Sequence, residues 1–213
     1  MDYLKTFVDL FLQLDVHLDT ITSEYGFLTY LLLFAIIFCE TGLVVAPFLP
    51  GDSLLFATGA LAARGLLNLP ILLLILCAAS IAGNTVNFQI GCLLRNKIAN
   101  RENISFIKRE HLDRAHLFFK KNGGKTLIIA RFVPVIRSIA PFVAGVGAMQ
   151  YSKFIYYNVV GGIAWVSSLL FGGYFFAHLP VVEDNFSFFI LGITFISLIS
   201  GFITIFRKNM IKI

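Results

Sequence analysis

Charged residues are scarce in this sequence. Lys, Arg, Asp and Glu make up 14% of its 213 residues, whereas a soluble domain of this size carries roughly 25%. The hydrophobic fraction is 58% and the mean hydropathy is +0.84. We therefore predict an all-α polytopic membrane protein, with room for one compact membrane domain and for no sizeable soluble domain.

Residues that hold metals or form redox centres are also scarce. Cys39, Cys77 and Cys92 lie in apolar stretches without a Cys-x-x-Cys motif, and the four histidines are scattered. We interpret the cysteines as small buried hydrophobic residues and expect neither a metal nor a cofactor. Ser53 and Ser138 have no evident base in the polar stretches described below, so we do not expect an enzyme.

The N-terminus lacks the basic start of a signal peptide. The first 20 residues contain one basic residue, Lys5, and four acidic ones, Asp2, Asp9, Asp15 and Asp19. A signal peptide would be basic here. The apolar residues recur at helical spacing. We predict an interfacial amphipathic helix over residues 1–24.

Long apolar runs follow, separated by one strongly basic segment. A helix needs about 20 apolar residues to cross the hydrocarbon core, so residues 71–94, 154–177 and 186–206 are predicted transmembrane helices of a membrane domain over 25–206. Segment 95–125 carries nine basic and three acidic residues, and the tail 207–213 is basic. Both are predicted to be cytoplasmic by the positive-inside rule, the first as an amphipathic segment.

Two further apolar runs, 27–63 and 126–149, carry charge and helix-breaking residues. If 126–149 spanned fully, the basic tail would lie outside, so the charge bias favours a re-entrant segment that dips in and returns. Irregular backbone at membrane depth survives only where protein or a water-filled cavity surrounds it. We predict two re-entrant helical hairpins that enter from opposite faces, as in inverted repeats. The residues expected to shape them are Pro47, Pro50 and Gly51 in the first and Pro134, Pro141 and Gly145 in the second.

The charges inside these two runs are acidic in the first and basic in the second. Glu40 and Asp52 lie in the first, and Arg131 and Arg137 in the second. Mutual pairing would relieve the cost of burying them, and ion pairs that merely hold the hairpins together are one interpretation. The other is a functional site. Two guanidinium groups indicate a phosphate-bearing ligand, with helix N-termini near Gly51 and Pro134 as further anion donors.

The two acids have a second predicted role. Glu40 and Asp52 indicate proton coupling, or gating by exchange of ion-pair partners.

Small and polar residues mark two of the predicted spans. Ser80, Asn84 and Asn87 fall near one face of the second apolar run, and interhelical packing and pathway lining explain them equally well. Ala164, Ser168 and Gly172 recur every four residues. This spacing predicts a helix-packing face.

Two motifs in this order resemble the DedA family, also called the SNARE-associated or VTT-domain family. The first runs from Glu40-Thr-Gly through Pro47, Pro50, Gly51 and Asp52 to Phe56, and the second from Arg131-Phe-Val-Pro134 through Arg137 and Pro141 to Ala144-Gly145. The resemblance implies a bacterial inner-membrane protein with two opposed re-entrant hairpins. Members are implicated in moving polyprenyl phosphate carriers and in drug and alkali tolerance that depends on the proton motive force.

The family's membrane-embedded acids and arginines match Glu40, Asp52, Arg131 and Arg137. Many members carry Gly-Asp where this chain has Gly83-Asn84, which leaves Glu40 and Asp52 as the better proton-coupling candidates.

The leading functional hypothesis is a lipid-carrier translocase for undecaprenyl phosphate or a related phospholipid that supports envelope homeostasis, with proton coupling as a candidate energy source. The alternatives are a proton-coupled antiporter for small cations or cationic drugs, and a membrane scaffold for envelope assembly. The expected partners are membrane lipids, protons and, as an open alternative, further copies of the chain, but no nucleic acid. The exact lipid, the direction of transport and the side of the N-terminus stay open.

Overall fold

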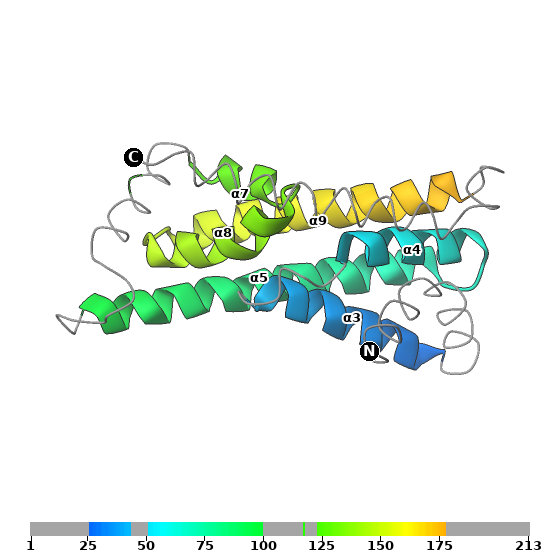
Figure 1. Ribbon diagram of the computed structural model, residues 1–213, viewed down its shortest axis with the longest axis horizontal. Helices are drawn as coiled ribbons and strands as arrows, with labels where there is room; N and C mark the ends of the chain where they lie inside the picture. Colours follow the sequence, from blue (N-terminus) through cyan, green and yellow to red (C-terminus); the bar gives the residue numbers. More distant parts are fainter. Residues whose placement is uncertain (1–25, 44–50, 100–116, 118–122, 178–213) are drawn as a thin grey trace, which may run out of the picture.

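The structure is a computed structural model that describes residues 26–43, 51–99, 117 and 123–177 of the chain. The predicted helix at 1–24, most of segment 95–125, the span at 186–206, the tail at 207–213, and Pro47 and Pro50 lie outside these residues. The described part is helical and contains no strand. Its helices are α3 (Phe27–Gly42), α4 (Gly51–Ala63), α5 (Leu69–Ala99), α7 (Lys125–Ala130), α8 (Pro134–Val146) and α9 (Tyr151–Phe176) (Figure 1).

Two of these helices are long and apolar enough to cross a membrane. The apolar part of α5 covers Leu69–Arg95 and α9 covers Tyr151–Phe176, with 27 and 26 residues. At 1.5 Å per residue each is about 40 Å long. They correspond to the predicted spans at 71–94 and 154–177, although α5 continues to Ala99. Large apolar side chains such as Leu74 and Leu93 are exposed on the outer surface, as expected for helices solvated by lipid.

The shorter helices cover the two halves of the long pair. In Figure 1, α3 and α4 flank one half of α5 and α9, and α7 and α8 flank the other. Helix α3 packs on α5 and α4 packs on α9, while α7 packs on α9 and α8 packs on α5. Exchanging α3, α4 and α5 with α7, α8 and α9 leaves this pattern unchanged. The described part of the chain therefore has the contacts of an internal two-fold repeat.

Pairs of glycines bring the equivalent helices into backbone contact. A Cβ atom on Gly173 of α9 would lie 1.9 Å from the carbonyl oxygen of Phe56, and one on Gly59 of α4 would lie 2.1 Å from that of Leu170. At the α5–α8 contact, a Cβ on Gly145 would lie 2.2 Å from the carbonyl oxygen of Phe88. Such distances exclude any side chain, so the close approach of these helices depends on glycine.

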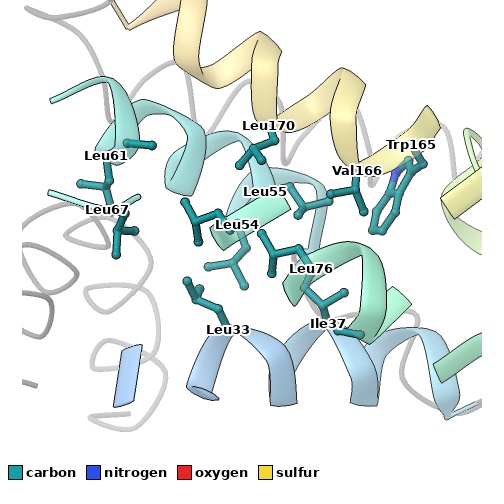
Figure 2. Packing of buried hydrophobic residues seen from close by; sticks show 13 residues of the cluster. Leu33, Ile37, Leu54, Leu55, Leu61, Leu67, Leu76, Trp165, Val166 and Leu170 are labelled. Atoms are coloured by element: carbon teal, nitrogen blue, oxygen red, sulfur yellow. The ribbon is translucent and has the colours of Figure 1, made fainter. Parts of the chain in front are cut away.

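The main apolar core lies in the α3–α4 half of the molecule. Figure 2 shows leucines of α4 between α3 and α9, with Trp165 at one end of the cluster. The labelled members are Leu33, Ile37, Leu54, Leu55, Leu61, Leu67, Leu76, Trp165, Val166 and Leu170. A smaller cluster of Phe88, Leu127, Ala144 and Phe154 fills the other half. The two clusters hold the short helices against α5 and α9.

Two sequence predictions about local packing are wrong. Pro141 was expected to help break the chain into a hairpin, but it lies inside α8, which continues to Val146. The chain changes direction earlier, in the non-helical residues 131–133, and Pro134 begins α8, where a missing N–H costs nothing. Ala164 and Ser168 lie on the exposed face of α9, whereas Gly161, Trp165 and Gly173 are buried. The packing face starts one residue away, which turns it by about 100° around the helix.

Candidate functional site

Arg137 stands at the centre of a buried charged cluster. It lies on α8 and is 6% exposed. Its Nη1 donates a hydrogen bond to Asp52 Oδ1 of α4, and its Nη2 donates to Glu40 Oε1 of α3. Glu40 is fully buried. One guanidinium fork therefore joins three helices and pairs the basic half of the chain with both acids of the other half. We call Glu40, Asp52 and Arg137 the Arg137 centre.

The Glu40 carboxylate also faces the first residue of α4. The backbone N–H of Gly51 donates to Glu40 Oε1 at 3.3 Å. A Cβ atom on Gly51 would lie 1.6 Å from Glu40 Oε2, so only glycine leaves room for the carboxylate. The positive end of the α4 dipole favours this position. The sequence predicted that a helix N-terminus near Gly51 would face an anion, and in the structure that anion is the protein's own Glu40.

Trp165 completes the Arg137 centre from α9. Its Nε1–H donates to Asp52 Oδ1 at 3.1 Å, and the Arg137 guanidinium carbon lies 4.7 Å from the centre of its ring. The side chain is 2% exposed. Trp165 thus touches both members of an ion pair and adds a cation–π contact. Sequence reasoning missed it, although a lone tryptophan in the whole chain was an available signal.

Arg131 lies in a different environment. It sits in the break between α7 and α8 and is 3% exposed. Its Nη1 donates to Ser80 Oγ at 2.5 Å, and its Nη2 donates to the carbonyl oxygen and Oδ1 of Asn158 at 3.2 and 2.5 Å. With its amide oriented to suit its neighbours, Asn84 accepts from Nη2 at 2.7 Å. We call Ser80, Asn84 and Asn158 the neutral cage of Arg131.

The interpretation that all four charges pair with one another therefore does not hold for Arg131. Glu40 and Asp52 are the acidic residues within the described ranges, and both bind Arg137. Arg131 instead faces α5 and α9, which present amides, a hydroxyl and glycines. A Cβ atom on Gly161 would lie 3.0 Å from Arg131 Cδ. The absence of a side chain there lets the Arg131 side chain lie against α9.

Asn158 holds this second environment together. Besides accepting from Arg131, its Nδ2 donates to the carbonyl oxygen of Ile81 at 3.0 Å and to Thr85 Oγ1 at 3.2 Å. It is 2% exposed and ties α9 to α5. Sequence reasoning missed Asn158, whose signal was a single amide within the apolar run 154–177. It did single out Ser80 and Asn84, which here both pack between helices and bind Arg131.

Several buried polar atoms near the Arg137 centre have no hydrogen-bond partner. Asn87 Nδ2 donates to the carbonyl oxygens of Thr41 and Ser138 at 3.1 and 2.8 Å, which links α3, α5 and α8. Its Oδ1 has no partner, and the same holds for Glu40 Oε2, Arg137 Nε and Ser138 Oγ. Together these atoms offer acceptors, an N–H donor and a hydroxyl. Such a set suits a hydrogen-bonding guest with both kinds of group.

The described residues contain no group of three or more His, Cys, Asp and Glu side chains placed to hold a metal ion. Ion pairs and hydrogen bonds join the side chains of the Arg137 centre. Because its charges come from segments distant in sequence, any relative movement of α3, α4 and α8 must alter the pairing.

Fold and site together define a helical membrane protein whose charged centre lies where two sets of short helices meet. The model of the VTT domain matches residues 49–175. Over 211 residues the chain is 47% identical to Protein DedA of Escherichia coli K12, covering 98% of this chain and 96% of that protein. The chain belongs to the VTT-domain family, the DedA family.

More distant relatives carry names that agree with a membrane location. The chain is 38% identical over 168 residues to an uncharacterized membrane protein of Mycobacterium leprae, covering 79% of this chain and 75% of that protein. It is 36% identical over 152 residues to the inner membrane protein YqjA of Escherichia coli K12, covering 71% and 69%. No solved structure matches the chain. The chain is therefore a membrane protein.

Proposed function

We propose that this protein is a bacterial inner-membrane translocase that moves undecaprenyl phosphate, or a related phospholipid, across the bilayer. The observation that carries the proposal is the presence of two buried arginines where the two sets of short helices meet, one of them without an acidic partner in the described structure. Arginine stays charged in a low dielectric and binds phosphate oxygens through its fork. The phosphate would bind in this polar centre while the polyprenyl tail stays in lipid.

The proposed topology places α3–α4 and α7–α8 in the membrane as re-entrant hairpins from opposite faces. Helices α3, α4 and α8 have 16, 13 and 13 residues, fewer than the about 20 needed to span. In Figure 1, α3 runs toward the middle of the molecule and α4 runs back, while α7 and α8 do the same from the other end. Segment 95–125 and the C-terminus lie in the cytoplasm in this scheme, and 186–206 is the third span.

Proton coupling is the second element of the proposal. Glu40 and Asp52 share one arginine, so the Arg137 centre carries one excess negative charge when both are ionised. A proton on either acid removes this excess and leaves the other acid paired. Proton uptake therefore supplies a change of charge without exposing a bare ion to lipid, which is what coupling to the proton motive force requires.

Reconstitution tests the proposal. Purified protein in vesicles is expected to move labelled undecaprenyl phosphate between leaflets, faster with a pH gradient than without. Glu40→Gln keeps the size of the side chain but cannot take up a proton, and is expected to lose the gradient dependence. A wild-type protein that inserts correctly but moves no labelled lipid would contradict the proposal.

A proton-coupled antiporter for small cations or cationic drugs is the second candidate. It is favoured by one specific observation, that Arg137 is already the counter-ion of both acids. In that case Arg137→Lys should retain most activity, since a point charge suffices. A phosphate site that needs the planar fork should lose function with Lys at Arg131.

A further inference from the structure

The two buried arginines differ in how their charges are balanced. Arg137 donates from both terminal nitrogens to carboxylates, and Trp165 covers its plane. Arg131 donates from both terminal nitrogens to neutral oxygens of Ser80 and Asn158. With its acids ionised, the Arg137 centre has a net charge of one negative unit. The side chains of the neutral cage carry no charge, so Arg131 and its cage together have a net charge of one positive unit.

This difference decides where an anion can bind. A phosphate approaching Arg137 meets the carboxylates of Glu40 and Asp52, which repel it and compete for the same N–H groups. A phosphate approaching Arg131 meets a buried cation whose neighbours are dipoles. Dipoles orient a guanidinium and offset part of its desolvation, but they do not neutralise its charge. An anionic ligand supplies the missing charge.

The cage also has the chemistry of a recognition site. Ser80 and Asn84 come from α5 and Asn158 from α9, and all three are buried. The amide oxygens of Asn84 and Asn158 hold the guanidinium, while their N–H groups donate to oxygens of α3 and α5. The Ser80 hydroxyl can donate a hydrogen bond to a phosphate oxygen. A Cβ atom on Gly162 would lie 3.5 Å from Arg131 Nη1, so the two glycines Gly161 and Gly162 let the Arg131 side chain pack directly against α9. The cage lies between the two longest helices of the described chain, α5 and α9.

We propose that the phosphate of the ligand binds at Arg131, oriented by Ser80, Asn84 and Asn158, while Arg137 stays committed to Glu40 and Asp52. This inference rests on the proposed function for the class of ligand. It goes further by assigning different roles to the two arginines. Arg131 recognises the anion, and the Arg137 centre responds to protons and to the relative position of the helices. A lipid phosphate and free inorganic phosphate share the required chemistry.

Binding measurements on the full-length protein test this division. The protein is placed in nanodiscs of phosphatidylcholine, and binding of radiolabelled farnesyl phosphate is measured, with farnesol and inorganic phosphate as competitors. Arg131→Gln is expected to weaken binding at least roughly tenfold, the loss of one charge-assisted contact. The triple variant Glu40→Gln/Asp52→Asn/Arg137→Gln removes all three charges of the Arg137 centre, and with them its net charge of one negative unit. It is expected to bind within about threefold of wild type.

Matched variants separate recognition from structure. Asn158→Ala and Ser80→Ala are expected to weaken binding by roughly threefold to tenfold, because each removes one hydrogen bond that orients Arg131. Lys153→Gln removes a positive charge from the exposed start of α9 and is expected to leave binding unchanged. Arg131→Lys retains the charge, so it should bind more tightly than Arg131→Gln even if the glutamine variant folds poorly.

Each outcome has a defined meaning. The inference is overturned if Arg131→Gln binds as tightly as wild type, if the triple variant loses as much affinity as Arg131→Gln, or if wild type binds neither phosphate probe. Equal competition by farnesol would also overturn it. If farnesyl phosphate binds at Arg131 but no undecaprenyl phosphate crosses vesicles, the proposed function fails and the inference stands. Competition by inorganic phosphate alone supports a free phosphate ligand at the same subsite.

Discussion

Arg137→Gln is expected to destabilise this protein far more than removal of either acid that Arg137 binds. The reason is the ratio of charges, because two carboxylates share one guanidinium. Removing the arginine leaves Glu40, which is fully buried, and Asp52 without a cation. Breaking a buried ion pair in this way costs about 3–5 kcal/mol. Removing Glu40 as Glu40→Gln leaves a balanced pair of Asp52 and Arg137.

The size of the effect can be converted into a melting temperature. For a domain of this length, 1 kcal/mol corresponds to roughly 2–4 °C, so Arg137→Gln is expected to melt on the order of 10 °C below wild type. Glu40→Gln should cost less than about 1 kcal/mol, because the glutamine Oε1 still accepts from Gly51. The loss of helical circular dichroism on heating in detergent measures both values.

A triple variant provides the control for this prediction. Glu40→Gln/Asp52→Asn/Arg137→Gln replaces every ion of the centre with a neutral side chain of similar size. Replacing a buried ionic network as a whole is often close to neutral, so the triple variant should melt well above Arg137→Gln alone. If Glu40→Gln and Arg137→Gln melt at the same temperature, the argument from charge ratio is refuted.

Three further predictions concern packing and topology. Gly173→Ala should destabilise the α4–α9 contact by about 1–3 kcal/mol through overpacking. Gly172→Ala should be tolerated, because its Cβ would have no neighbour nearer than 3.7 Å. Equal melting temperatures of the two variants would contradict the close contact. Trp165→Phe should cost about 1 kcal/mol through the lost hydrogen bond to Asp52, and Trp165→Ala about 3–5 kcal/mol, with thermal melting as the measurement and equal losses as the contrary result. In a cysteine-free background, Arg64→Cys should react with an impermeant thiol reagent from outside the cell and Lys125→Cys only from inside, and labelling of both from one side would contradict opposed hairpins.

Sequence reasoning was strongest where the energetic cost of placing a residue in water or in lipid leaves few structural alternatives. Length and apolar character sufficed to predict α5 and α9, because an apolar run of this length is typical of a transmembrane helix. The cost of charge in lipid drew attention to Glu40, Asp52 and Arg137, and the structure brings these three together. Both conclusions rest on local composition, which a single sequence contains.

Sequence reasoning was weaker where the answer depends on which helix faces which. Arg131 and Arg137 looked equivalent, but Arg131 lies in the break before α8 and faces Ser80 and Asn158. The spacing of Ala164 and Ser168 was right for a packing face, but the buried face lies one residue further along the helix. A shift of one residue turns the face by about 100° around the helix axis. Asn158 and Trp165 were missed because their partners lie in other segments of the chain, 27 to 113 residues away.

The arrangement of the two arginines has a consequence for how helices can move under the proposed function. The Arg137 centre joins α3, α4 and α8, and Trp165 adds α9, whereas the neutral cage ties Arg131 to α5 and α9 alone. Separating α8 from α4 must break the Arg137–Asp52 pair but breaks no described contact of Arg131 with its cage. A proton on Asp52 lowers the electrostatic cost of that separation, since Glu40 remains to balance Arg137. The ligand site can therefore persist while the helices around it rearrange, as transport with access to alternate sides requires.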